Sequence, residues 1–204
     1  KMQTGNFVLA GEAMALFIAQ EEAPLEDVSL WSSGIAGAEL NVAIGLARLG
    51  HRVSYLTALG DDTFGRKIRA FLTANHISDE LAFCDPKRMT GFMLKGKTSR
   101  GDPPIQYFRK GSAASALGVE ETSRCLEGRA GGFLHMTGIF PALSEQTLAA
   151  SEAMMRRARE LGMTVTFDPN LRPQLWPDEG TMVRTLNRLA EYADVFLPGV
   201  KEGR

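Results

Sequence analysis

Short apolar segments alternate along this chain with amphipathic segments of helical period. The apolar segments have the length of buried strands and lie at 7–11, 53–58, 132–138, 164–168 and 194–197. The helices predicted between them lie at about 38–49, 64–72, 120–126, 144–161 and 179–192. Such alternation predicts an α/β fold with a parallel, doubly wound sheet, because each helix returns the chain to the next parallel strand.

Two stretches, 14–33 and 89–111, interrupt this alternation with short strand-like pieces. In the second stretch the pieces 90–95 and 105–110 flank a polar loop, which is typical of an inserted hairpin. We expect the two stretches to pair as a small accessory β-sheet. Ligands of open α/β sheets bind beyond the carboxyl ends of the strands, so this accessory sheet is a candidate lid over such a site.

The composition is that of an ordinary globular protein, with 204 residues, 44 % of them hydrophobic and 23 % charged. We expect a single domain over residues 6–204. A net charge of −1 gives no electrostatic support for binding nucleic acid or an acidic membrane surface. No apolar run approaches the roughly 18 residues of a membrane span. Two isolated cysteines, Cys84 and Cys125, are expected to be reduced thiols of a cytoplasmic protein.

A first candidate site lies at Gly34–Gly37, a run of small residues before the helix predicted from Ala38. We expect a loop here, because glycine allows a backbone to approach a ligand closely. The helix N-terminus offers free N–H groups, and Asn41 adds a side chain that donates and accepts hydrogen bonds. The spacing matches neither a dinucleotide fingerprint nor a Walker A loop, so it favours a small polar ligand over a nucleotide.

The strand predicted at 105–110 provides a second candidate. Strand alternation places Tyr107 and Arg109 on one face and Phe108 and Lys110 on the other. A tyrosine and an arginine directed into one pocket suit a ligand that carries hydroxyls and a carboxylate or phosphate. Periodicity alone leaves open the alternative of a surface strand with solvated charges.

The segment after the strand at 164–168 provides a third candidate. Asp168, Asn170 and Arg172 follow this strand, and two prolines stiffen their loop. Arg172 could clamp an anion; the alternative is that Asp168 forms a turn and Arg172 a surface pair. We favour the ligand site, because of its place at a strand end. For Asp61 and Asp62 we favour helix capping over metal binding.

Two of these segments resemble the N-terminal signature of the ribokinase-like (PfkB-type) carbohydrate kinases. They are Gly34-x-x-Gly37-Ala-Glu-x-Asn41-x-Ala-x-Gly45-Leu-Ala-Arg-Leu-Gly50 and Gly60-x-Asp62-x-x-Gly65. The segments 107–115, 137–139, 167–173 and 175–177 are similar to 2-keto-3-deoxygluconate kinases. The resemblance implies a Rossmann-like αβα sandwich with a small β-sheet lid. It also implies transfer of the ATP γ-phosphoryl to a sugar hydroxyl, with ATP and Mg²⁺ as cofactors.

The resemblance further implies the residues of the site. Those expected to bind the sugar are Gly34, Gly37, Ala38, Asn41, Met93, Tyr107, Phe108, Arg109 and Arg172. Those expected near the nucleotide are Asn170, Leu171 and Arg172. A cation near the ligand favours a sugar acid, such as 2-keto-3-deoxygluconate, which would be phosphorylated to its 6-phosphate. Fructokinase and 5-dehydro-2-deoxygluconokinase are the alternatives, and pairing of lids would give a homo-oligomer.

The sequence departs from the family pattern at two places. The family's Asn-x-x-Glu reads Gly199-x-x-Glu202 here, which leaves Glu202 as the only candidate metal ligand. The family's Gly-Ala-Gly-Asp, which carries the general base, does not occur up to Arg204. No catalytic residue is therefore assigned, and the expected aspartate would lie beyond Arg204. A truncation that binds a sugar without phosphorylating it is the further alternative.

Overall fold

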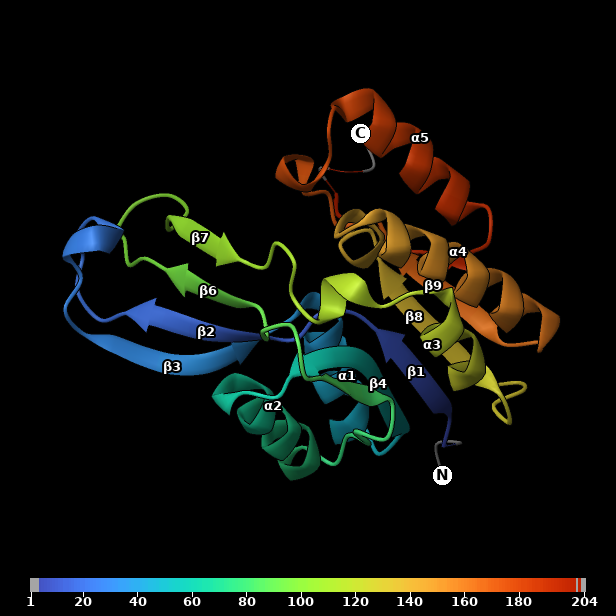
Figure 1. The fold of residues 1–204 in the computed structure, drawn as a ribbon. Helices are drawn as coiled ribbons and strands as arrows, with labels where there is room; N and C mark the ends of the chain where they lie inside the picture. The colour runs from blue at the N-terminus through green and yellow to red at the C-terminus, as the bar shows by residue number, and fades with distance from the viewer. Residues whose placement is uncertain (1–3, 201, 203–204) are drawn as a thin grey trace.

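Two β-sheets organise the chain (Figure 1), and the structure, a computed structural model, describes residues 4–200 and 202. The larger sheet has six strands, each parallel to its neighbours: β1 (Asn6–Ala10), β4 (Arg52–Gly60), β5 (Ala82–Asp85), β8 (Phe133–Thr137), β9 (Thr164–Asp168) and β10 (Val195–Phe196). Their order is β10-β9-β8-β1-β4-β5. The chain winds outward from β1 first to one side and then to the other, which confirms the doubly wound α/β prediction. Ligands of such sheets bind at this reversal, between β1 and β8.

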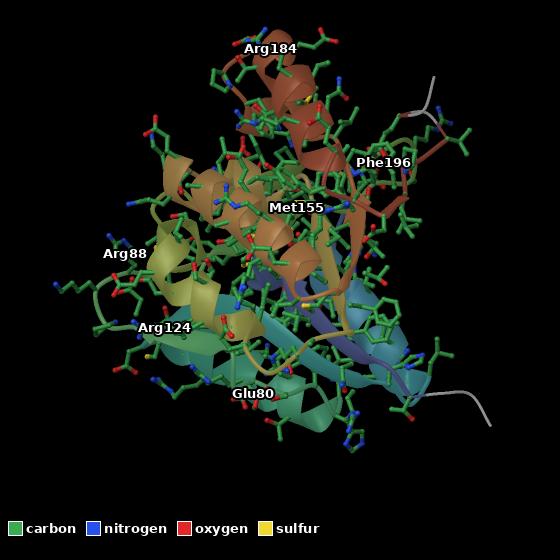
Figure 2. The ribbon with its side chains drawn as sticks, turned by 90° about the vertical axis from the view of Figure 1, so that its right-hand side faces the viewer. Glu80, Arg88, Arg124, Met155, Arg184 and Phe196 are labelled. Carbon is green, nitrogen blue, oxygen red and sulfur yellow. The ribbon has the colours of Figure 1, made fainter. Side chains whose placement is uncertain are left out.

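Helices cover both faces of this sheet (Figure 1). They are α1 (Ala38–Arg48), α2 (Thr63–Ala74), α3 (Val119–Ser123), α4 (Glu145–Glu160) and α5 (Glu179–Ala190). Strand alternation divides the core between the two faces. Val8 of β1 packs in a cluster with Met155 of α4, whereas the next residue, Leu9, packs with Leu40 of α1 and Ile68 of α2. Figure 2 labels Met155, a buried residue of α4. The result is an αβα sandwich.

The smaller sheet is the lid, and it projects from the sandwich beside α2 (Figure 1). Its strands are β2 (Met14–Ala19), β3 (Trp31–Ala36), β6 (Phe92–Lys95) and β7 (Ile105–Phe108), in the order β3-β2-β6-β7. Strands β2 and β3 pair antiparallel, and so do β6 and β7. The two central strands, β2 and β6, are parallel to each other and join the two pairs into one sheet. The outer face of the lid packs on α2, where the rings of Phe17 and Phe92 lie 5.6 and 5.9 Å from that of Phe64.

Several boundaries differ from those predicted. Residues Gly34–Ala36 belong to β3 rather than to a loop, because β3 pairs along its length with β2. Strand β3 thus begins at Trp31, near the end of the stretch 14–33, and continues past it to Ala36. Strand β7 ends at Phe108, so Arg109 and Lys110 follow the strand rather than belong to it. Strand β5 was not predicted, and it adds the outermost strand beside β4.

The helix cap predicted at Asp61 or Asp62 is confirmed for Asp62. Asp62 caps α2 by accepting a hydrogen bond of 2.7 Å from the N–H of Gly65, and its second oxygen accepts one of 2.7 Å from the N–H of Thr90 at the entry to the lid. Ser144 caps α4, and Gly162 follows that helix with a positive φ of 64°. At the sheet edge formed by β10, Phe196 lies exposed (Figure 2). Within residues 4–200 and 202, no helix is both long and apolar enough to cross a membrane.

Candidate active site between the lid and the sheet

A cavity of about 460 Å³ lies between the lid and the carboxyl ends of the main strands. The lid contributes Met14, Ala36, Met93, Lys95, Tyr107 and Arg109. The sandwich contributes Glu12, Gly37, Ala38, Glu39, Asn41, Ile139, Asn170, Arg172, Gln174 and Leu175. The cavity therefore brings together residues of the three candidate sites of the sequence, which lie up to 136 residues apart between Ala36 and Arg172. Such a concave, polar-lined site suits a small polar molecule.

The start of α1 forms one side of the cavity. Gly37 precedes the helix, and any side chain there would begin 2.9 Å from the Cβ of Leu40 and 3.1 Å from the carbonyl oxygen of Glu12. Glycine is thus required for the helix to approach the end of β1. Ala38 and Asn41 follow on the cavity wall, where the free N–H groups of the first turn and the Asn41 amide can bind hydroxyls.

Glu12 joins the sandwich to the lid. Its Oε2 accepts a hydrogen bond of 2.7 Å from Nε of Arg109 and lies 2.6 Å from Nη2 of the same guanidinium in an ion pair. Its Oε1 accepts a hydrogen bond of 2.6 Å from the hydroxyl of Ser112. The side chain of Glu12 is 1 % exposed and that of Arg109 is 10 % exposed. Arg109 lines the cavity as expected, but its charge is already compensated within the protein. The pair holds the end of β7 against the end of β1.

Glu39 is a second buried carboxyl in the cavity wall, in the first turn of α1. Its Oε1 accepts a hydrogen bond of 2.5 Å from the hydroxyl of Thr137, at the end of β8. A side chain at Gly11 would begin 2.2 Å from Oε2 of Glu39, so this carboxyl occupies the space that the glycine leaves. Burial raises the pKa of Glu39 from 4.5 to about 7, against the lowering effect of the Thr137 hydrogen bond. Glu39 thereby ties α1 to the reversal point between β1 and β8.

Asn170 and Arg172 lie at the boundary of two cavities. Both line the cavity under the lid, and both line a second cavity of about 500 Å³ that extends to Leu197–Val200. Asn170 has a positive φ of 38°, and its buried Oδ1 has no hydrogen-bond partner in the described part of the chain. A strained backbone and an unsatisfied buried acceptor are typical of a ligand site. A molecule in one cavity could meet a molecule in the other at these two residues.

Glu202, the candidate metal ligand, has a different role in the structure. Its two carboxylate oxygens accept hydrogen bonds of 2.7 Å from the N–H groups of Leu171 and Gly199. It therefore fixes the loop after β9 beside the second cavity. Leu171, expected near the nucleotide, supplies this N–H but does not line either cavity. Among residues 4–200 and 202, no group of three or more His, Cys, Asp or Glu side chains is arranged to hold a metal ion.

Two expected sugar-binding residues lie outside the cavity lining. Phe108 points to the opposite face of the lid, where its ring stacks 4.4 Å from that of Phe92. Gly34 lies within β3 opposite Leu16, and the lining does not include it. Conversely, Lys95 and Gln174 line the cavity and were not anticipated. Strand alternation could have identified Lys95, because it shares a face with Met93.

Two curated proteins are similar to this chain over most of its length. The chain is 45 % identical over 197 residues to the 2-dehydro-3-deoxygluconokinase of Bacillus subtilis (strain 168), covering 96 % of this chain and 60 % of that protein. It is 32 % identical to the enzyme of the same name from Thermoproteus tenax, covering 92 % and 57 %. The chain thus spans about three fifths of the length of these curated relatives.

A solved structure and a family model extend the comparison. The PfkB protein from Polaromonas sp. JS666 is 45 % identical to this chain and superimposes with a TM-score of 0.92, covering 98 % of this chain and 68 % of that one. The model of the pfkB family of carbohydrate kinases matches residues 5–204. Sequence and fold agree, and the chain therefore belongs to the pfkB carbohydrate kinase family.

Proposed function

We propose that the complete protein containing this chain transfers the γ-phosphoryl group of ATP to a hydroxyl of a sugar acid, 2-keto-3-deoxygluconate, and forms the 6-phosphate. The observation that carries this proposal is the pair of cavities that meet at Asn170 and Arg172. Two cavities that share residues suit a reaction between two substrates, because phosphoryl transfer requires donor and acceptor to be held in line. The names of the relatives that are 45 % and 32 % identical support the choice of sugar acid.

In this proposal the residues under the lid hold the sugar. The first-turn amides after Gly37 and the side chain of Asn41 bind its hydroxyls, and Met93 and Tyr107 cover it from the lid. Arg172 stands between the cavities, where a guanidinium can stabilise the charge of the transferring group. Arg172 donates a hydrogen bond of 2.8 Å to the carbonyl of Leu171, which orients it in its loop.

The second cavity suits the phosphates of ATP, which supplies the phosphoryl group when bound. Asn170 contributes a side-chain amide there, and the loop that Glu202 fixes forms the cavity's other wall. The described residues do not suit a direct Mg²⁺ site, since both oxygens of Glu202 are engaged by backbone N–H groups. We propose that Mg²⁺ enters with the nucleotide.

The test is a kinase assay on the complete natural protein with ATP and Mg²⁺. We expect kcat/KM for 2-keto-3-deoxygluconate to exceed that for fructose by at least tenfold, with the 6-phosphate identified by NMR. Faster turnover of fructose would overturn the sugar-acid assignment in favour of a fructokinase. Absence of ADP formation with any sugar, despite binding, would establish a non-catalytic sugar-binding protein. Association through the lid stays a prediction, which light scattering can check.

A further inference from the structure

Lys95 is a basic residue of the cavity for which the family resemblance implies no role. It is the last residue of β6, it pairs with Ile105 of β7, and it lies on the same face of the lid as Met93. Its side chain is half-buried and lines the cavity. Among residues 4–200 and 202, its ammonium group has neither an ion-pair partner nor a hydrogen-bond acceptor.

The charges around the cavity leave Lys95 with an uncompensated positive charge. Glu12 and Arg109 neutralise each other in a buried pair. Glu39 is hydrogen-bonded to Thr137, and because burial raises its pKa to about 7, it carries little negative charge below neutral pH. The positive charges that remain are those of Lys95 and Arg172. The cavity therefore attracts a molecule that is anionic in at least one place.

Among the residues that the structure describes, the two cavity cations without an ion-pair partner, Lys95 and Arg172, lie in different parts of the site. Arg172 lines both cavities, so it lies where the phosphoryl group must pass. Lys95 lines the cavity under the lid and a further cavity of the lid at Gly96–Thr98, but not the second cavity that Arg172 shares. It lies on a strand that leads away from the sandwich (Figure 1). In a linear six-carbon acid, the carboxylate at C1 and the acceptor hydroxyl at C6 are at opposite ends of the chain. A substrate with C6 near Arg172 thus directs C1 away from the nucleotide cavity.

We propose that Lys95 binds the carboxylate of the sugar acid and so sets the specificity of the site for 2-keto aldonic acids over neutral sugars. This inference rests on the proposed function of the same cavity. Lys95 acts by ion pairing and hydrogen bonding to the substrate carboxylate, while Arg109, whose charge Glu12 compensates, positions the lid.

The test compares Lys95→Ala with the wild-type complete protein on 2-keto-3-deoxygluconate and on fructose. Loss of a partly buried partner of a charged group reduces binding by roughly 10- to 100-fold. We expect Lys95→Ala to lower kcat/KM for the acid by that factor, mainly through KM, and to change the value for fructose less than threefold. Lys95→Arg, which keeps the charge, should recover at least half of the loss on a logarithmic scale.

The matched control is Lys97→Ala, two residues along the chain. Lys97 donates a hydrogen bond of 3.0 Å to the carbonyl of Gln20 and does not line the cavity, so its removal should leave both substrates unaffected. A loss below fivefold for Lys95→Ala on the acid, or an equal loss on fructose, would overturn the role of Lys95. Wild-type turnover of the acid tests the proposed function separately, since a wild-type protein inactive on the acid would refute that function before any variant is compared.

Discussion

The two walls of the cavity are built in contrasting ways. On the sandwich side, the carboxyls of Glu12 and Glu39 are almost completely buried, and hydrogen bonds from Arg109, Ser112 and Thr137 satisfy them. On the lid side, Lys95 and Tyr107 are half-buried, and within residues 4–200 and 202 their polar ends make no hydrogen bond. The difference indicates that the sandwich wall fixes the geometry of the site, whereas the lid wall offers groups that a ligand can complete.

Breaking the buried pair should have the largest effect on stability. Glu12→Ala leaves the guanidinium of Arg109 buried without its partner, which costs about 3–5 kcal/mol of unfolding free energy in comparable pairs. Urea denaturation measures the change. Arg157→Ala, whose pairs with Glu127 and Glu160 are solvent-exposed, is the control and should have a far smaller effect. If the two variants lowered the unfolding free energy equally, the buried pair would not be what fixes the sandwich wall.

Glu39 should make stability depend on pH in the opposite sense to an ordinary ion-paired carboxylate. Its pKa is raised from 4.5 to about 7 on folding, so between these values the unfolded chain releases a proton that the folded chain retains. Stability therefore falls as the pH rises from 4.5 to 7, by ~3 kcal/mol for a shift of this size. Unfolding free energies of the wild type and Glu39→Gln at pH 5 and 7.5 measure this contribution.

The comparison with Glu39→Gln is informative because the amide has no charge to lose. The difference between the two proteins should change with pH, and a constant difference would show that burial does not hold a proton on Glu39. Thr137→Val sharpens the test. It removes the hydroxyl that lowers the pKa of Glu39 in the folded state, so the decline in stability should begin at the same pH but continue to a higher pH.

Substitutions in the lid wall should have the smallest effects on stability and a clear effect on substrate binding. Tyr107→Ala should raise KM for the sugar roughly tenfold, the cost of one lost hydrogen bond, and change the unfolding free energy by less than about 1 kcal/mol. Its neighbour Phe108 faces outward, so Phe108→Ala should cost about 1–2 kcal/mol of stability through the lost stacking on Phe92 and leave KM unchanged. If both variants raised KM, the inward and outward faces of β7 would not have separate roles in binding and stability.

The sequence was sufficient to predict most of the fold, because hydrophobic periodicity reflects burial directly. It was insufficient for β3, where Gly34 and Gly37 favoured a loop. What makes Gly34–Ala36 a strand is pairing with β2, a tertiary contact that local propensity does not contain. The outward direction of Phe108 did follow from strand alternation, and that rule was a better guide than the family resemblance.

The sequence was sufficient to identify most residues of the site, but not the contacts between them. Tyr107, Arg109, Asn170 and Arg172 were all expected near a ligand and all line the cavity. The partner of Arg109, however, lies 97 residues away in sequence, and only the folded chain shows that Glu12 compensates it. Among the described residues of the lid, the cavity cation without an ion-pair partner is consequently Lys95. Its importance can be recognised only once Arg109 is known to be paired.

The parallel pairing of β2 with β6 has a consequence for anyone who wishes to re-engineer the lid. Parallel neighbours cannot be joined by a tight turn, so a long crossover must separate them. Here that crossover contains α1, β4, α2 and β5, which are part of the sandwich itself. The lid is thus one continuous sheet in space, but its strands come from two separate segments of the sequence. A lid exchanged between two kinases would have to be moved as two segments, 14–36 and 92–108, together with the Glu12–Arg109 pair that fastens it.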